Sequence, residues 1–173
     1  NNRTMQNAYP PGSIFKLILS MIALEHNIID DSWKINCNGV YDFHDTKFHC
    51  WKKGGHGSVN LSQSIQKSCN IFFYNLMQKI DLDFWYTEVT KFGFGQLTGI
   101  DLPSENKGLI PNKKYMNMTY KDRGGWSKGH LLNLSIGQGE TLTTPLQIIN
   151  FINIIANEGY CYKPHLNKLN KKE

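Results

Sequence analysis

The pattern of apolar and polar residues predicts a helix close to the start of the chain. Apolar side chains recur there at helical spacing, at Ile14, Leu17, Ile18, Met21, Ile22 and Leu24. This spacing gives the helix one apolar face and extends it to about Glu25. Residues 10–12 are Pro-Pro-Gly, which cannot continue a helix, so we expect a turn with a restricted backbone directly before it.

This arrangement places Ser13 at or near the helix N-terminus and Lys16 three residues later on the same face. A serine hydroxyl is a poor nucleophile without a neighbouring base. A lysine one turn away serves as that base when burial or nearby cations displace its proton. The helix N-terminus adds N–H groups that stabilise an acyl oxyanion. The structural alternative is a serine cap followed by a solvated lysine, and Ser-x-x-Lys alone is a weak motif.

A second helical pattern begins after residues 58–63 and is broken in its middle. Its apolar positions are Ile65, Phe72, Phe73, Leu76 and Met77. The interruption is Ser68-Cys69-Asn70, where Ser and Asn compete with the helix backbone and favour a cap or a break. Ser68 and Asn70 form a Ser-x-Asn pair about fifty residues after Ser-x-x-Lys, which is typical of penicillin-recognising serine enzymes.

Three further helices are expected downstream. One runs from Asp83 as N-cap to Lys91 and ends at the glycines that follow. A weak, short helix begins at Asn112. The last begins with Thr144 as N-cap and a proline at the first helical position, and it is strongly apolar to about Asn157.

The rest of the chain is predicted as loops and two short strands. Residues 132–136 alternate as a strand does, and 160–166 form a second candidate. Gly137-Gln138-Gly139 is a turn without the Gly-Lys-Ser/Thr ending of a phosphate loop, and no dinucleotide fingerprint is present. Residues 30–57 are rich in Gly, Asn, Asp and His, and we predict mostly loop there.

Composition bounds the fold more than the function. With 173 residues, of which 40% are hydrophobic and 19% charged, the chain supports one globular domain with a core and not a disordered segment. The net charge of +5 would suit an anionic partner such as nucleic acid. Because the lysines are scattered along the chain, we expect a solvated surface and no nucleic-acid partner. No apolar run reaches the roughly 18–20 residues that span a bilayer.

Four residues in or beside the predicted loop form a candidate metal site: Cys37, Cys50, His56 and Cys69. Three thiolates and an imidazole make a complete tetrahedral zinc set, and so long a loop commonly needs a tie. A disulfide or buried free thiols are the alternatives, with His44 and His49 as other imidazoles. Any disulfide leaves one clustered cysteine over, which favours the metal. Cys161 is remote in sequence and is expected in the core.

Several motifs occur together, in order, along nearly the whole chain. They are Tyr9-Pro10-Pro11-Gly12-Ser13-x-x-Lys16, Trp51-Lys52-Lys53-Gly54-Gly55-His56-Gly57, Ser68-x-Asn70 with Phe72-Phe73-Tyr74, Thr98-Gly99-Ile100-Asp101-Leu102, Gly137-Gln138-Gly139 and Thr144-Pro145-Leu146-Gln147. This series resembles the transpeptidase domain of class B penicillin-binding proteins. The tryptophan-containing motif most closely resembles their elongation-type subgroup, penicillin-binding protein 2.

The resemblance implies an α/β (α+β) fold of the penicillin-binding protein and serine β-lactamase type. It also implies a peptidoglycan D,D-transpeptidase, in which Ser13 attacks the penultimate D-Ala of a stem peptide and forms an acyl-enzyme that an acceptor amine resolves. Lys16 would be the base, Ser68 would relay a proton to the leaving group, and Asn70 would hold the lysine and a substrate amide. β-Lactams would acylate the same serine.

Further expectations follow from the resemblance. Related proteins carry a zinc ion at positions matching Cys37, Cys50, His56 and Cys69, and four protein ligands make such a site structural. The partner would be a membrane glycan polymerase of the elongation machinery, at the periplasmic face of the bacterial inner membrane. Residues 1–173 would form a partial transpeptidase domain, without the membrane anchor, the pedestal domain and the C-terminal part. The family's Lys-Thr/Ser-Gly strand does not occur in the chain.

Two alternatives stay open. Another serine acyl enzyme of the same fold, such as a division-type transpeptidase, a β-lactam sensor or a β-lactamase, would carry the same motifs. Rapid deacylation by water needs a positioned general base, and the sequence offers no evident candidate. The second alternative is a non-catalytic scaffold stabilised by zinc, with Ser13 as a helix cap. Covalent penicillin labelling separates the enzymes from the scaffold, and rapid loss of the label identifies a β-lactamase.

Overall fold

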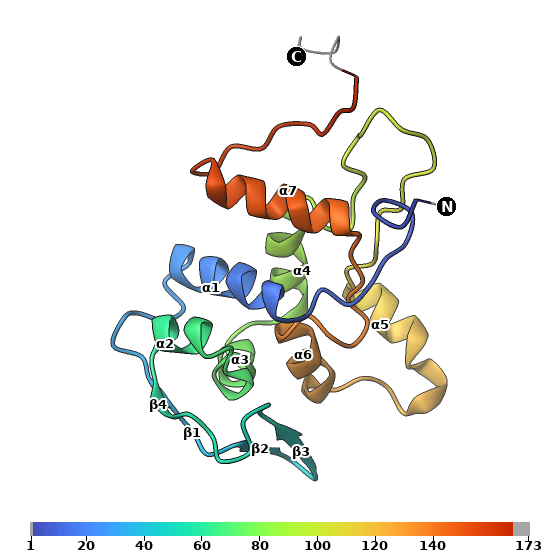
Figure 1. Cartoon of the computed structure of the whole chain (residues 1–173). Coiled ribbons are helices and arrows are strands. Elements are labelled where there is room, and N and C mark those ends of the chain that lie inside the picture. Colours follow the sequence, from blue (N-terminus) through green and yellow to red (C-terminus); the bar gives the residue numbers. More distant parts are fainter. Residues whose placement is uncertain (1, 168–173) are drawn as a thin grey trace.

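The computed structural model describes residues 2–167 of the chain (Figure 1). The 3₁₀ turns are η1 (Gly12–Ile14) and η2 (Lys121–Arg123). The helices are α1 (Phe15–Glu25), α2 (Leu61–Gln66), α3 (Asn70–Met77), α4 (Leu82–Lys91), α5 (Lys113–Thr119), α6 (Lys128–Ser135) and α7 (Pro145–Ala156). The strands are β1 (Ile35–Cys37), β2 (Val40–Phe43), β3 (Thr46–His49) and β4 (Gly57–Val59).

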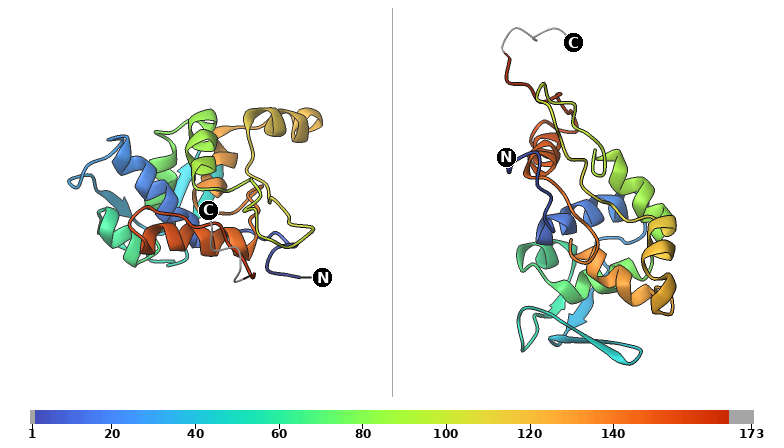
Figure 2. Two further views of the ribbon diagram at one scale, coloured as in Figure 1. Left: turned by 90° about the horizontal axis from the view of Figure 1, so that it is seen from above. Right: turned by 90° about the vertical axis from the view of Figure 1, so that its right-hand side faces the viewer.

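Helix α1 runs through the middle of the molecule, with α7 on one side and α2 and α3 on the other (Figure 1). The strands form two separate antiparallel pairs, β1 with β4 and β2 with β3. In the side view, the β2–β3 hairpin lies at the opposite end of the molecule from α7 (Figure 2). No helix within residues 2–167 has the length and apolar character needed to cross a membrane.

Buried aromatic side chains join α1 to the elements around it. The ring of Phe15 lies 5.1 Å from that of Phe94 and 6.4 Å from that of Trp85, measured between centroids. Phe94 in turn packs 5.7 Å from Phe151 of α7. All four side chains are buried, and removing one side chain of this size from water stabilises the fold by about 2–3 kcal/mol. The packing of Phe15 in the core therefore holds the start of α1 in place.

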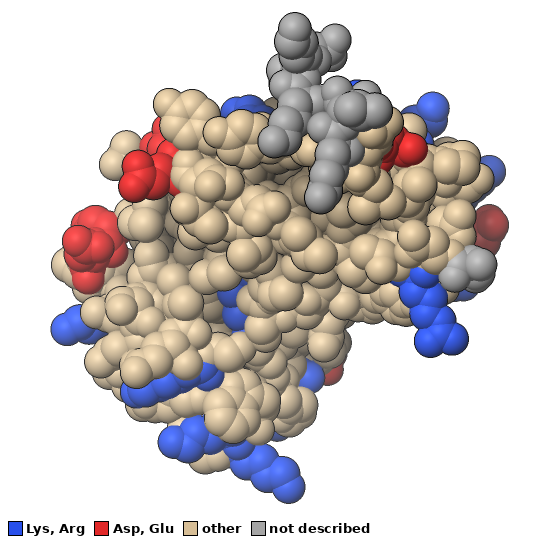
Figure 3. Space-filling view, turned by 45° about the horizontal axis from the view of Figure 1, so that its top comes forward, with Lys and Arg blue, Asp and Glu red and all other residues tan. Residues whose placement is uncertain are grey.

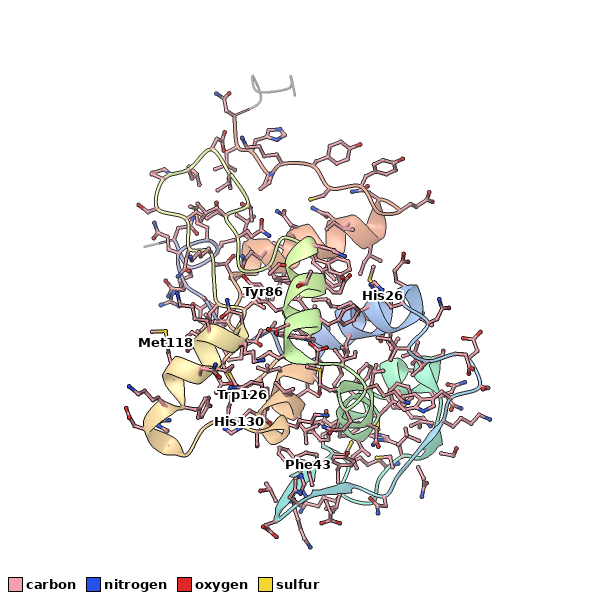
Figure 4. All side chains as sticks on the ribbon, turned by 180° about the vertical axis from the view of Figure 1, so that it is seen from behind. His26, Phe43, Tyr86, Met118, Trp126 and His130 are labelled. Atoms are coloured by element: carbon pink, nitrogen blue, oxygen red, sulfur yellow. The ribbon has the colours of Figure 1, made fainter. Side chains whose placement is uncertain are left out.

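A charged contact fixes the other end of α1. The carboxylate of Glu88, on α4, lies 3.0 Å from Nε2 of His26 and 2.6 Å from Nζ of Lys91. Figure 4 labels His26 at this end of α1. The hydrogen bond from Lys91 lowers the pKa of Glu88 despite its burial. Both ends of α1 are thus held against α4, which leaves little freedom to the residues at its N-terminus.

Local capping signals predicted several elements correctly. Helix α1 follows the Pro-Pro-Gly turn and ends at Glu25. The helical pattern that is interrupted at residues 68–70 corresponds to two helices, α2 and α3, with the predicted break between them. Asn112 caps α5, and Thr144 caps α7 through a capping box with Gln147. Side-chain oxygens of Asn and Thr accept bonds from otherwise unpaired N–H groups of the first turn, so these positions are readable from sequence.

Other predictions were wrong. Residues 132–136 are not a strand but lie mostly in α6, because Ser127 and His130 form a capping box ahead of them and three leucines face the core, Leu131, Leu132 and Leu134. Residues 160–166 form no strand, and Cys161 is exposed, not buried in the core. Helix α4 is capped by Asp81, two residues before the N-cap that we predicted, Asp83. The expected loop at 30–57 contains strands β1, β2 and β3, and β4 begins at its last residue.

Candidate active site and metal-ligand cluster

Ser13 lies in the 3₁₀ turn that leads into α1, and its side chain is exposed. The preceding residue, Gly12, has a φ of +64°, a conformation that favours glycine. Its N–H donates a hydrogen bond of 2.9 Å to the carbonyl of Gly137. The turn is therefore anchored to a distant segment immediately before Ser13, which fixes where the hydroxyl points.

Lys16 is 2% exposed, and its ammonium group is surrounded by oxygen atoms. Its Nζ lies 2.7 Å from Oδ1 of Asn70, 2.8 Å from the carbonyl oxygen of Ser68 and 2.9 Å from Ser68 Oγ. Ser13 Oγ lies 3.3 Å from the same nitrogen. Burial lowers the pKa of Lys16 from 10.5 to about 8, although the thiols of Cys50 and Cys69 act in the opposite direction.

This set of neighbours determines where the lone pair of a neutral Lys16 points. A neutral amine has two N–H groups, and both find acceptors that cannot donate, namely Asn70 Oδ1 and the Ser68 carbonyl. The lone pair is then left for hydroxyl groups that can donate, those of Ser13 and Ser68. The Ser68 hydroxyl also lies 2.9 Å from Ser13 Oγ. The arrangement can remove the Ser13 proton directly or through Ser68.

Ser68 and Asn70 are presented by the break between α2 and α3. Ser68 has a φ of +49°, a left-handed conformation that is uncommon for a residue with a side chain. The backbone N–H of Cys69 donates to the Ser64 carbonyl and closes this turn. Asn70 begins α3, and its Nδ2 donates to the carbonyl of His49 at 3.2 Å. That bond leaves Oδ1 of Asn70 facing Lys16.

A surface hollow of about 410 Å³ opens over these groups. Its lining residues are Gly12, Ser13, Trp51, Ser68, Asn70, Ile136 and Gln138. Trp51 is 65% exposed, and its Nε1 donates to the Lys67 carbonyl at 3.0 Å, which holds the ring at the rim. Trp51, Ile136 and Gln138 were not predicted as site residues. Two of them belong to the Trp-Lys-Lys-Gly and Gly-Gln-Gly motifs seen in the sequence, but only the tertiary fold brings these motifs next to Ser13.

The four predicted metal ligands lie together beside this hollow. Cys37 ends β1, Cys50 follows β3, His56 precedes β4 and Cys69 caps α3. Their ligand atoms all lie within 4.8 Å of one another, and His56 Nδ1 is 3.5 Å from both Cys37 Sγ and Cys50 Sγ. A zinc ion with ordinary bond lengths to sulfur and nitrogen separates such atoms by about 3.6 Å in a tetrahedron. All the cysteines in the described range are free thiols.

The protonation state of His56 also suits a cation. Burial, and then the charges of Lys52 and Lys67, lower the pKa of this imidazole, which keeps it neutral at neutral pH, as a metal ligand requires. Gly55 permits the close approach of the two chain segments, because a Cβ there would lie 2.0 Å from the Cys37 carbonyl. His44 and His49, the other imidazoles considered, are exposed and lie outside the group. On the face that Figure 3 shows, Lys and Arg side chains lie at several separate places.

Comparison with known proteins gives consistent results. A family model described as the penicillin binding protein transpeptidase domain matches residues 1–173. The peptidoglycan D,D-transpeptidase MrdA of Acinetobacter baumannii is 41% identical over 169 residues, which cover 95% of this chain and 25% of the relative. MrdA of Escherichia coli is 32% identical over 167 residues, which cover 95% of this chain and 26% of the relative. The chain spans about a quarter of the length of these curated relatives.

Solved structures of similar proteins share the fold. In the complex of penicillin-binding protein PBP2 with MreC from Helicobacter pylori, the matching chain has a TM-score of 0.93 and 33% identity, with coverage of 100% of this chain and 32% of that one. PBP2 of Pseudomonas aeruginosa in complex with WCK 5153 has a TM-score of 0.89 and 32% sequence identity, and the match covers 97% of this chain and 38% of that one. These matches confirm the predicted fold class.

Proposed function

The chain belongs to the penicillin-binding protein transpeptidase family, and from this premise we propose that Ser13 is the acylated nucleophile of an elongation-type peptidoglycan D,D-transpeptidase. One observation carries the proposal. A buried lysine amine lies 3.3 Å from Ser13 Oγ, and acceptor-only groups bind its two N–H positions. That environment supplies a base for an exposed serine, whereas a solvated lysine next to a helix cap would have no such partners.

The reaction proceeds through an acyl-enzyme. Lys16 takes the Ser13 proton, directly or through Ser68, as Oγ attacks the carbonyl carbon of the penultimate D-Ala in a stem peptide. The C–N bond to the terminal D-Ala breaks, Ser68 passes a proton to the departing nitrogen, and an ester joins Ser13 to the peptide. An amine of a second stem peptide then attacks the ester, which restores the serine hydroxyl and forms the cross-link. In a β-lactam the broken C–N bond lies in a ring, so the leaving nitrogen stays attached.

The lining of the hollow favours transfer to an amine over hydrolysis. Hydrolytic release of the acyl group needs a base that activates water. Among the described residues that line the hollow, none carries a carboxylate. Lys16 is neutral again once the departing nitrogen has received its proton through Ser68, so it can take the proton of an attacking acceptor amine, which is a better nucleophile than water. This observation ranks a transpeptidase above a β-lactamase of the same fold.

We also propose that Cys37, Cys50, His56 and Cys69 hold one structural zinc ion. The separations of the donor atoms and the neutral imidazole support it. When bound, the ion would tie strands β1, β3 and β4 to the start of α3. Because Cys69 lies between Ser68 and Asn70, its ligation would hold the turn that presents both side chains. Four protein ligands leave no position for a reacting water, so the role is structural.

The names of the relatives support a proposal about partners and location. Curated relatives are named peptidoglycan D,D-transpeptidases, and one PBP2 of known structure is bound to MreC. We propose that the intact protein acts on peptidoglycan stem peptides, binds β-lactams covalently and assembles with a membrane glycan polymerase at the periplasmic face of the inner membrane.

Labelling of the full-length protein with a fluorescent penicillin tests the proposal. We expect one stable label per chain, lost in Ser13→Ala and kept in Ser62→Ala, which removes an exposed hydroxyl on α2. Circular dichroism should show both variants folded. Labelling of a folded Ser13→Ala protein would show that Ser13 is not the nucleophile. A wild-type label that decays within minutes would favour the β-lactamase, and a folded wild-type protein without label would favour the scaffold.

A further inference from the structure

The turn that carries Gln138 into the catalytic hollow lies between two anchors. At its start, the carbonyl of Gly137 accepts the N–H of Gly12 at 2.9 Å. Gly137 has a φ of +68°, and a Cβ there would lie 2.2 Å from the Gly12 carbonyl. The first anchor is therefore the backbone that also positions Ser13. Gln138 and Gly139 follow and are exposed.

The second anchor is a side-chain contact that the mechanism does not use. The hydroxyl of Tyr120, at the end of α5, donates a hydrogen bond to Oε1 of Glu140. The His130 ring packs edge-on against the Tyr120 ring, with 4.3 Å between centroids, and Nδ1 of His130 accepts the N–H of Ser127 at 3.1 Å. Seen from behind, Trp126 and His130 lie where the chain passes from α5 to α6 (Figure 4). Tyr120 is thus held in place from its other side.

The next backbone anchors come only after Glu140. Leu142 exchanges two hydrogen bonds with Leu109, and Thr143 exchanges two with Tyr9. Within residues 2–167, the segment from Gly139 to Thr141 makes no backbone–backbone hydrogen bond. Without the contact to Tyr120, the turn would be held only at its start, where Gly137 accepts the N–H of Gly12 and the N–H of Gln138 donates to the carbonyl of Asn133 at 2.9 Å. Burial raises the pKa of Tyr120 to about 12, so this hydroxyl keeps its proton at neutral pH.

We propose that Tyr120 and Glu140 position Gln138 for substrate recognition, and that they act on binding before acylation and not on the chemical step. Gln138 lines the hollow together with Ser68 and Asn70, and a side-chain amide matches the donors and acceptors of a peptide backbone or a β-lactam amide. Within the described residues, no hydrogen bond joins Lys16 or Ser13 to Tyr120 or Glu140, so we expect the proton transfer to stay intact. This inference rests on the proposed transpeptidase function.

Acylation kinetics of the full-length protein test the inference. Measured over a range of penicillin concentrations, the rate separates into a dissociation constant for the initial complex and a saturating acylation rate. We expect Tyr120→Phe to raise the dissociation constant about five- to tenfold, the equivalent of one ordinary hydrogen bond, and to leave the saturating rate within about twofold. Glu140→Gln keeps a side-chain oxygen that can accept the Tyr120 hydroxyl, so this variant should bind penicillin with a near-normal dissociation constant. Tyr115→Phe on the same helix is the matched control and should bind normally.

A double-mutant cycle identifies Gln138 as the residue through which Tyr120 acts. If Tyr120 works only by placing Gln138, then Tyr120→Phe should add nothing to Gln138→Ala. Additive losses, an unchanged dissociation constant in Tyr120→Phe, or an equal loss in Tyr115→Phe would each overturn the proposal.

Amide hydrogen exchange supplies a readout that does not depend on penicillin. We expect faster exchange in Tyr120→Phe than in wild type or Tyr115→Phe at the N–H groups of Gln138 and Leu142, which are hydrogen-bonded on either side of the turn. Unchanged exchange there would refute the positioning role even if binding changed. Failure of the proposed function has a different signature, because the wild-type protein would then take no label at all while the exchange difference persisted.

Discussion

The pH dependence of acylation tests the role of Lys16 most directly. The Lys16 residue is 2% exposed, and this burial lowers its pKa from 10.5 to about 8. In the proposed mechanism, the neutral amine is the form that accepts the Ser13 proton. Since deprotonation increases as pH rises through the pKa, the rate constant for acylation should rise with pH and level off above about 8.

The expected magnitude follows from that pKa. At pH 7 about one tenth of the protein carries a neutral Lys16, and at pH 9 about nine tenths does, so acylation should rise by roughly tenfold between these values. A lysine with its ordinary pKa would instead be almost fully charged at pH 7. Its neutral fraction would rise by about a hundredfold over the same interval without a plateau.

The assay is the second-order rate of labelling by a fluorescent penicillin between pH 6 and pH 9.5, with the full-length protein. Lys53→Gln removes an exposed lysine of the tryptophan-containing motif and should leave the profile unchanged. Lys16→Arg keeps the charge but cannot deprotonate, and it should lose about 10²- to 10⁴-fold in rate at every pH. A wild-type profile that is flat, or that still climbs tenfold per unit at pH 9.5, would refute the reasoning.

Three further outcomes are expected. Ser68→Ala removes the hydroxyl that contacts both Ser13 and Lys16 and should slow labelling by about 10²-fold or more, with thermal unfolding as the control for its fold. Phe15→Ala leaves a cavity beside Phe94 and should lower the free energy of unfolding by about 3–5 kcal/mol; a loss below 1 kcal/mol in urea titration would contradict the core assignment. Cys69→Ser should reduce bound zinc and the melting temperature together, whereas Cys161→Ser at an exposed thiol should change neither.

Short-range signals account for what the sequence predicted well. The Ser-x-x-Lys pair depends only on one helical turn, and the break at Ser68-Cys69-Asn70 depends on side chains that compete with their own backbone. The structure brings Ser13, Lys16, Ser68 and Asn70 together. It likewise gathers the four predicted ligands. The catalytic roles and the zinc ion stay predictions.

Long-range packing accounts for what the sequence missed. Alternation over residues 132–136 fits a strand and a buried helix equally well, and only the capping box of Ser127 and its packing against α3 decide for α6. The strands of 35–59 are three or four residues long, too short for a visible period. Trp51 and Gln138 reach the hollow from segments that are far from Ser13 in sequence, so no local pattern could assign them.

The bond between Asn70 and the carbonyl of His49 links the β2–β3 hairpin to the proposed base. His49 ends the β2–β3 hairpin, and its carbonyl also accepts the hydroxyl of Tyr74. Because a carbonyl only accepts, it turns the amide of Asn70 so that its oxygen faces Lys16 and accepts one of the N–H groups of the amine. Under the proposed mechanism, a change in the hairpin that moves this carbonyl would slow acylation while leaving every reacting group in place.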